Sequence, residues 1–253
     1  MISRARLKFL RSLDRKKIRA QEGLLLVEGF NALEEAAAGG YLRELFLGDG
    51  AAEAERGRAL VDRGLPLTRL ESRDVEELTD TRTPMGAFGL VADPCGPFDG
   101  ALLPDLALLL VAAGVADPGN LGTLIRTAAG LGADALVVTP GTVEPTNPKV
   151  VRASAGALFR IPVLRAEPQD LADAGFELLL ADADGRSLAE WTGRAARTAL
   201  VLGNEPRGFD AVWSRTACTA IGVPLQAEVE SLNVASAAAI LLHALAALPV
   251  RDG

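Results

Sequence analysis

The stretch LALLLVAAG (Leu106–Gly114) is an unbroken aliphatic run that ends at a glycine. Such a run is typical of a strand buried on both faces of a parallel sheet. Further strand-like runs and helix-like segments alternate after it. The strands are DALVVT (134–139), FELLLAD (176–182) and TALVLG (198–203), and the helices are NLGTLIRTAAGLG (120–132), NPKVVRASAGALF (147–159) and SLNVASAAAILLHALAAL (231–248). This alternation predicts an α/β domain with a doubly wound parallel sheet.

A second, smaller α/β domain is expected before this run. LLLVEG (24–29), LRELFLG (42–48) and LPLTRL (65–70) are predicted strands, and NALEEAAAGG (31–40) and AAEAERGRALVDRG (51–64) are predicted helices. The proline- and glycine-rich stretch VADPCGPFDGALLPD (91–105) is typical of a linker. We therefore expect a domain at 1–93, a linker at 94–104 and a second domain at 105–253.

The composition excludes several classes of protein. The chain of 253 residues is 49% hydrophobic and 23% charged, which suits a packed globular protein. No apolar run reaches the roughly 20 residues of a membrane helix, and the N-terminus lacks the apolar core of a signal peptide, so a cytoplasmic protein is expected. Cys95 and Cys218 lack neighbouring metal ligands, so neither a metal site nor a disulfide is expected. The single histidine, His243, lies in an apolar helix pattern and is interpreted as a structural or interface residue.

Positive charge is concentrated at the N-terminus. Residues 1–20 carry eight basic side chains and the single acid Asp14, a net charge of +7, whereas the whole chain carries −7. Such a basic segment on an acidic protein can bind a phosphate backbone, or it can simply form a solvated helix face. Lys149 and Arg152 form a second basic pair. The candidate RNA-binding residues are Arg4, Arg6, Lys8, Arg11, Lys149 and Arg152.

Ligands of open α/β sheets bind beyond the carboxyl ends of the strands. The first long strand is followed by GVADPGNLG (114–122), which has neither dinucleotide-binding nor Walker A spacing. Three other segments at expected strand ends carry small residues and a few polar heads: DPGNLGTLIRTA (117–128), LGNEPRGFD (202–210) and VPLQAEVESLNVASA (223–237). A neutral, amide-rich site suits a cationic cofactor better than a phosphate.

In this order, the three segments resemble the three motifs of the SpoU (TrmH-type) family of RNA 2′-O-methyltransferases, in the SPOUT class. The resemblance covers Leu106 to about Ala247, and PTNPKVVRASAGALFRIPV (145–163) matches the segment after the first motif. It implies a deep trefoil knot in the C-terminal domain, a pocket for S-adenosylmethionine and a homodimer packed through the knotted regions. The N-terminal half resembles the family's small substrate-binding domain of ribosomal-protein-like fold.

The resemblance also implies roles for individual residues. Arg126 matches the arginine used at the reacting ribose, where it either holds a phosphate and stabilises the developing oxyanion or acts as a base through a depressed pKa. Asn120, Glu205, Ser231 and Asn233 match the other catalytic positions, although Ser231 is also placed to cap the last helix. The residues that match cofactor-contacting positions are Leu202, Gly203, Val223, Leu225, Leu232 and Asn233.

The expected activity is therefore transfer of a methyl group to a ribose 2′-hydroxyl, most directly of ribosomal RNA. Three alternatives remain open: a transfer-RNA methyltransferase, an enzyme that modifies an antibiotic site, and a catalytically silent RNA-binding or ribosome-assembly protein of the same fold. An unrelated small-molecule enzyme is the remaining alternative. A small-molecule enzyme can be distinguished from the RNA-binding alternatives by salt dependence, because only an RNA-binding protein should show an RNA affinity that falls steeply with salt.

Overall fold

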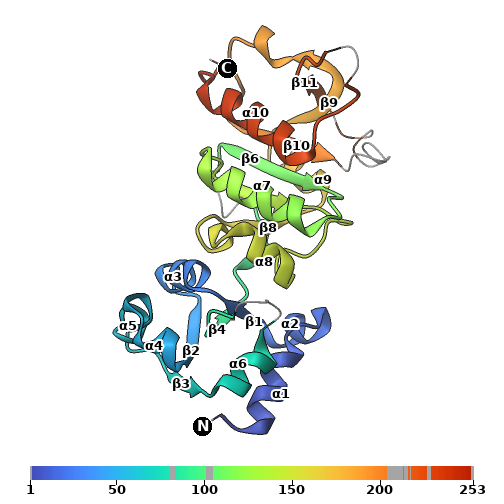
Figure 1. The fold of residues 1–253 in the computed structure, drawn as a ribbon. Coiled ribbons are helices and arrows are strands. Elements are labelled where there is room, and N and C mark those ends of the chain that lie inside the picture. Colours follow the sequence, from blue (N-terminus) through green and yellow to red (C-terminus); the bar gives the residue numbers. More distant parts are fainter. Residues whose placement is uncertain are drawn as a thin grey trace. The chain divides into compact units, whose positions relative to one another are not determined.

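The computed structural model divides the chain into two compact units (Figure 1). One unit comprises Met1–Pro94 and Thr146–Arg160, and the other comprises Cys95–Pro145 and Ile161–Gly253. The structure describes residues 2–79, 84–100, 105–203, 213, 216, 218–226 and 229–251. The first unit thus takes in a segment, Thr146–Arg160, that lies within the C-terminal domain expected from the sequence.

The first unit is built on a four-stranded sheet in the order β1-β4-β2-β3. β4 is antiparallel to both β1 and β2, and β3 is parallel to β2. The strands are β1 (Leu24–Glu28), β2 (Leu42–Gly48), β3 (Leu67–Leu70) and β4 (Ala87–Ala92). The helices are α1 (Arg4–Ser12), α2 (Lys16–Glu22), α3 (Phe30–Ala38), α4 (Asp49–Glu53), α5 (Glu55–Val61), α6 (Ser72–Leu78) and α8 (Pro148–Ser154), followed by the 3-10 turn η1 (Ala157–Phe159).

The basic N-terminal helix also contributes to the core of this unit. Ser3 caps α1, and Leu10 and Leu13 pack against Phe46 and Phe88. The buried Arg19 donates from its guanidinium to the carbonyl oxygens of Leu13 (2.9 Å) and Asp14 (2.6 Å), which satisfies acceptors after the end of α1. The apolar face of α1 therefore stabilises the unit while its basic face remains at the surface.

Two predicted helices are interrupted. The segment expected as one helix over 51–64 forms α4 and α5, because Ala54 is extended (φ −61°, ψ 148°). A Cβ on Gly57 would lie 1.9 Å from the carbonyl oxygen of Ala51, so the close approach of the two pieces requires this glycine. The helix expected over 147–159 ends at Ala155, whose φ of 49° is left-handed, and η1 follows after Gly156.

The second unit contains a seven-stranded sheet in the order β11-β9-β10-β6-β7-β8-β5, with every adjacent pair parallel. The parallel α/β architecture predicted from Leu106–Gly114 is confirmed: all residues of β6 (Leu108–Ala113) are buried. The other strands are β5 (Cys95–Pro97), β7 (Ala135–Val138), β8 (Val163–Arg165), β9 (Glu177–Ser187), β10 (Thr198–Gly203) and β11 (Cys218–Gly222). The edge strand β5 lies in the stretch expected as a linker.

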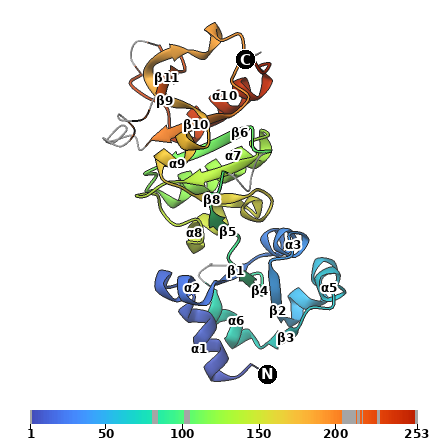
Figure 2. The same cartoon turned by 180° about the vertical axis from the view of Figure 1, so that it is seen from behind.

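Helices cover both faces of this sheet. α10 (Val234–Ala247) packs against α7 (Pro118–Gly130) and β10 on the face turned to the viewer in Figure 1. α9 (Pro168–Asp173), in front in Figure 2, places Leu171 against Leu109 and Val111 of β6. Since side chains alternate along a strand, Leu110 faces the opposite side. In the described part of the chain, no helix is long and apolar enough to cross a membrane.

Candidate functional site

A pocket of about 230 Å³ lies at the carboxyl ends of β10 and β11, beside residues 181–183 in the middle of β9 and the start of α10. Its walls are mostly aliphatic, with Ile221, Val234 and Leu241 among the larger lining side chains. Six residues predicted from the sequence line it: Leu202, Gly203, Val223, Leu225, Ser231 and Leu232. The structure thus brings the start of the second motif and residues of the third motif together around one cavity.

The local sequence explains how this pocket forms. β10 is buried along its length and ends at Gly203, and β11 ends at Gly222, so two backbones without side chains border the opening. A Cβ on Gly222 would lie 2.6 Å from the carbonyl oxygen of Asp182 and 2.9 Å from that of Gly185, so β9 can approach only a glycine there. The shape of the pocket mouth therefore depends on Gly203 and Gly222, because a residue without a Cβ allows another backbone segment to approach closely.

A hydrogen bond joins the first and third motifs. The side-chain amide of Asn233 donates to Oδ1 of Asn120 over 3.0 Å. Oδ1 of Asn233 accepts from the backbone N–H of Ala235 (3.0 Å), and Oδ1 of Asp117 accepts from the backbone N–H of Asn120 (2.7 Å). Each asparagine is consequently held at the N-terminus of a helix, and the bond between them joins the N-terminus of α7 to that of α10.

The expectation that Ser231 caps the last helix is wrong. Asn233 is the N-cap of α10, and Ser231 lies two residues earlier, exposed and lining the pocket. Serine and asparagine are about equally good N-caps, so the bond from Asn233 to Asn120 is what distinguishes them here. Ser231 is thereby free to present its hydroxyl to a ligand.

Arg126 lies on the exposed face of α7, almost two turns after Asn120. It does not line the pocket, and it makes no hydrogen bond or ion pair with the residues that the structure describes. A solvent-facing guanidinium in this position can contact an external anion. The remaining catalytic candidate, Glu205, lies outside the described residues.

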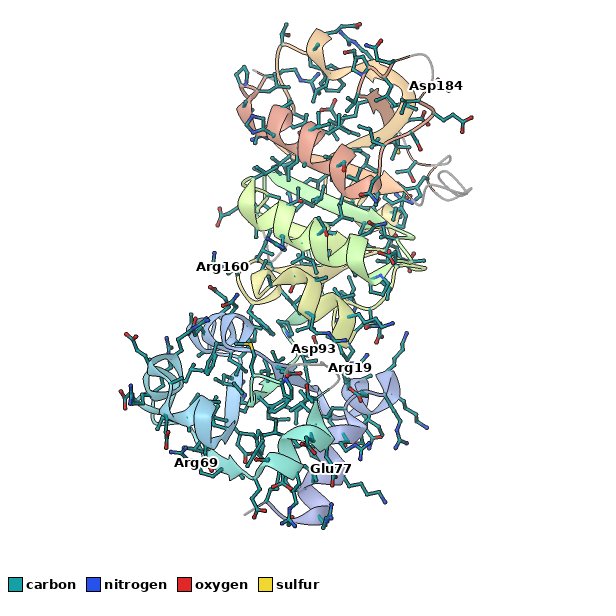
Figure 3. All side chains as sticks on the ribbon, in the orientation of Figure 1. Arg19, Arg69, Glu77, Asp93, Arg160 and Asp184 are labelled. Carbon is teal, nitrogen blue, oxygen red and sulfur yellow. The ribbon has the colours of Figure 1, made fainter. Side chains whose placement is uncertain are left out.

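All six candidate RNA-binding residues belong to the first compact unit, because Lys149 and Arg152 lie on α8. Three of them are paired with acids: Arg4 and Arg11 with Glu77 (2.7 and 3.9 Å), which Figure 3 labels, and Arg6 with Glu44. Lys8 and Lys149 are exposed and form no ion pair within the described part of the chain. Arg152 is also exposed and borders a hollow with Asp14 and Glu28. The basic face is therefore partly neutralised.

Sequence reasoning missed two acidic residues of the site. Asp117 is the cap of α7, and Asp182, the last residue of the strand expected over 176–182, lines the pocket. The available signal for Asp182 was an acidic residue at a predicted strand end. Cys218 is at the start of β11, away from the pocket, and burial raises the pKa of its thiol, which makes it unsuited to act as a nucleophile. Among the described residues, no group of three or more His, Cys, Asp or Glu could hold a metal ion.

Comparisons with known proteins agree with this geometry. Residues 107–243 match the SpoU rRNA Methylase family, and residues 4–89 match the MRM3-like substrate binding domain. The 23S rRNA (guanosine(2553)-2′-O)-methyltransferase RlmP of Bacillus subtilis is 32% identical over 93% of this chain and 93% of its own.

Two solved structures are similar over nearly the whole chain. A putative RNA methyltransferase of the TrmH family from Porphyromonas gingivalis is 30% identical, with a TM-score of 0.83, covering 97% of this chain and 98% of its own. AviRb from Streptomyces viridochromogenes, a SpoU methyltransferase in complex with AdoMet, is 25% identical, with a TM-score of 0.84, covering 96% of this chain and 97% of its own. With its second and third motifs meeting at one strand-end pocket and this family matched over residues 107–243, the chain belongs to the SpoU rRNA Methylase family.

Proposed function

We propose that this protein transfers a methyl group from S-adenosylmethionine to a ribose 2′-hydroxyl of ribosomal RNA. The observation that carries the proposal is the strand-end pocket lined by six motif residues beside the Asn120–Asn233 bond. The relative named as a 23S rRNA 2′-O-methyltransferase supports ribosomal over transfer RNA as the substrate. Such a substrate would place the enzyme in the cytoplasm.

The pocket residues fit S-adenosylmethionine. The described lining contains aliphatic side chains suited to an adenine ring, two glycines where backbone groups are accessible, one acid and no basic side chain. A lining of this charge suits a cationic ligand and disfavours a phosphate. Leu202, Gly203, Val223, Leu225, Leu232 and Asn233 would hold the cofactor, which supplies an activated methyl group on a sulfonium sulfur.

The chain's own residues would then position the ribose. Arginine is a cationic hydrogen-bond donor, so we assign Arg126 to hold a phosphate of the RNA and to stabilise negative charge on the 2′-oxygen. Asn120 and Asn233 fix the start of α7, and with it the direction from which Arg126 reaches. Ser231 offers a hydroxyl at the pocket mouth, and Glu205 completes the catalytic set. Such positioning can lower the activation free energy by roughly 7–11 kcal/mol.

We assign RNA binding to the domain at 1–93 together with the basic pair on α8, and methyl transfer to the domain at 105–253. RNA would be held by Arg4, Arg6, Lys8, Arg11, Lys149 and Arg152, with phosphates displacing Glu44 and Glu77 from the paired arginines. We further assign the N-terminal domain a ribosomal-protein-like fold and the C-terminal domain a deep trefoil knot, as the family resemblance implies.

We also propose that the protein forms a homodimer and that its activity requires no metal. Ile240 is 47% exposed on α10, and His243 lies exposed one turn further along the same helix. An exposed isoleucine on a helix that is otherwise rich in alanine suits packing against a second copy. Sedimentation of the protein and of Ile240→Glu tests this: dissociation of the variant supports the dimer, and a monomeric parent protein contradicts it.

The test of the proposed function compares two variants with the parent protein. Arg126→Ala should abolish methyl transfer to RNA while leaving the Kd for S-adenosylhomocysteine within about twofold. Thr123→Ala, on the same exposed face of α7, is the matched control and should retain activity. Equal loss of cofactor binding and methyl transfer in Arg126→Ala would contradict the role of this arginine. Failure of the parent protein to bind S-adenosylhomocysteine would contradict the function itself.

A further inference from the structure

Asp182 lies on an excursion of β9 that forms one side of the pocket. β11 pairs with β9 at Ala220–Leu180 and then at Ile221–Arg186, so residues 181–185 bulge out between two successive residues of β11. Three of the bulged residues, Ala181, Asp182 and Ala183, line the pocket. The bulge is thus the element through which β9 reaches the ligand.

The bulge is held in place by close backbone contacts. A Cβ on Gly185 would lie 2.5 Å from the carbonyl carbon of Ile221, and Gly222 is packed against the carbonyl oxygens of Asp182 and Gly185. Within the bulge, Oδ1 of Asp182 accepts from the backbone N–H of Asp184 over 2.9 Å. The carboxylate is therefore oriented by its own turn, and its second oxygen is available to a ligand.

Asp182 is the ionisable side chain of the described pocket lining. It lies two residues after Leu180, which pairs with Val201 of β10, and it lines the same pocket as Gly203 at the end of β10. Asn120 and Arg126 follow β6, on the other side of β10. β10 therefore lies between the strand that carries Asp182 and the strand that Asn120 and Arg126 follow, and neither Asn120 nor Arg126 lines the pocket.

We propose that Asp182 accepts hydrogen bonds from the two ribose hydroxyls of the cofactor's nucleoside half. A carboxylate is an acceptor-only group, and two adjacent hydroxyls supply the donors that it needs. An acidic residue fills this role toward a ribose hydroxyl in an unrelated nucleotide-binding fold. Asp182 is on a strand on the other side of β10 from Asn120 and Arg126, and it lines the pocket together with the aliphatic side chains against which the nucleoside would lie. This role rests on the proposed function.

The test uses calorimetric titration of the full-length protein, Asp182→Ala and the matched control Asp184→Ala. Asp184, labelled in Figure 3, lies on the same bulge but does not line the pocket. The probes are S-adenosylhomocysteine, 5′-methylthioadenosine, which lacks the amino-acid half, and the 2′,3′-dideoxy form of methylthioadenosine. The melting temperature of each unliganded variant reports whether the fold is retained.

We expect Asp182→Ala to raise the Kd of S-adenosylhomocysteine and of methylthioadenosine alike, by at least about tenfold, and to leave the Kd of the dideoxy probe unchanged. Asp184→Ala should leave all three unchanged. A loss confined to S-adenosylhomocysteine would overturn the proposal, because Asp182 would then contact the amino-acid half. Unchanged binding in Asp182→Ala would also overturn it. If the parent protein binds none of the probes, the proposed function fails first, and that outcome is recognised without any variant.

Discussion

The hydrogen bond between Asn120 and Asn233 makes a quantitative prediction about stability. Asn120→Ala removes only this bond, which is exposed, so we expect a loss of about 0.5–1 kcal/mol in the free energy of unfolding. Asn233→Ala removes the same bond together with the N-cap of α10, and a lost cap adds about 1 kcal/mol. The larger effect should therefore come from Asn233.

The double variant separates the two contributions. Because Asn233→Ala already breaks the bond, adding Asn120→Ala should cost almost nothing more, so the two single effects should fail to add by about 0.5–1 kcal/mol. Urea unfolding of the four proteins, followed by circular dichroism, measures this coupling, and thermal midpoints should fall by about 2–4 °C for each kcal/mol. Additive effects, or an Asn120→Ala variant as unstable as Asn233→Ala, would refute the assignment of cap and bond.

Three further perturbations follow from particular contacts. Deleting residues 1–20 would remove Leu10 and Leu13 from the core, so the basic face is better tested by the double variant Lys8→Ala with Lys149→Ala. In filter-binding assays this variant should bind RNA more weakly and with a smaller salt dependence, while its binding of S-adenosylhomocysteine should be unchanged. An unaltered salt slope would contradict the assigned surface. The Arg160 guanidinium lowers the pKa of Glu35, so their ion pair stabilises the protein at pH values above the ordinary glutamate pKa, and this stabilisation is lost as the pH falls through the lowered pKa. Acid unfolding of Glu35→Gln should lack this small pH-dependent contribution to stability, and a pH profile identical to that of the parent protein would count against it. Gly222→Ala places a methyl 2.6 Å from a carbonyl oxygen of the bulge, so it should lower both the melting temperature and the affinity for S-adenosylhomocysteine, and a variant unchanged in both would show that the bulge is free to move.

The two strands at the middle of the seven-stranded sheet could be predicted from sequence because their burial leaves a simple pattern. Thr198–Gly203 and Leu108–Ala113 are nearly uniform aliphatic runs that end in or just before glycine, and both are strands in the middle of the sheet. β5 and β11 were missed because Cys95–Pro97 and Cys218–Gly222 are short, mixed in composition and lie at the sheet edges. Two interior strands were missed as well: β8 (Val163–Arg165) has only three residues, and β4 (Ala87–Ala92) runs into the stretch that was expected to be a linker. Edge strands bury less surface and so need no such pattern.

The candidate site shows a similar division. The six pocket residues were identified through motif resemblance, and the fold brings them together. The choice of Asn233 over Ser231 as helix cap could not be made locally, because both residues favour that position and only a partner on α7 distinguishes them. The pairing of Arg6 with Glu44 and of Arg4 with Glu77 likewise depends on the tertiary structure, since the partners are far apart in the chain.

The central claim is methyl transfer to a ribose 2′-oxygen. The most direct measurement incubates the protein with tritium-labelled S-adenosylmethionine and unmodified ribosomal RNA, then maps the label by alkaline hydrolysis, since a 2′-O-methyl group protects the adjacent phosphodiester bond. We predict incorporation at a single alkali-resistant position, absent with Arg126→Ala. Label on a base, or no incorporation by a protein that binds S-adenosylhomocysteine and RNA, would contradict the account and favour a catalytically silent RNA-binding protein.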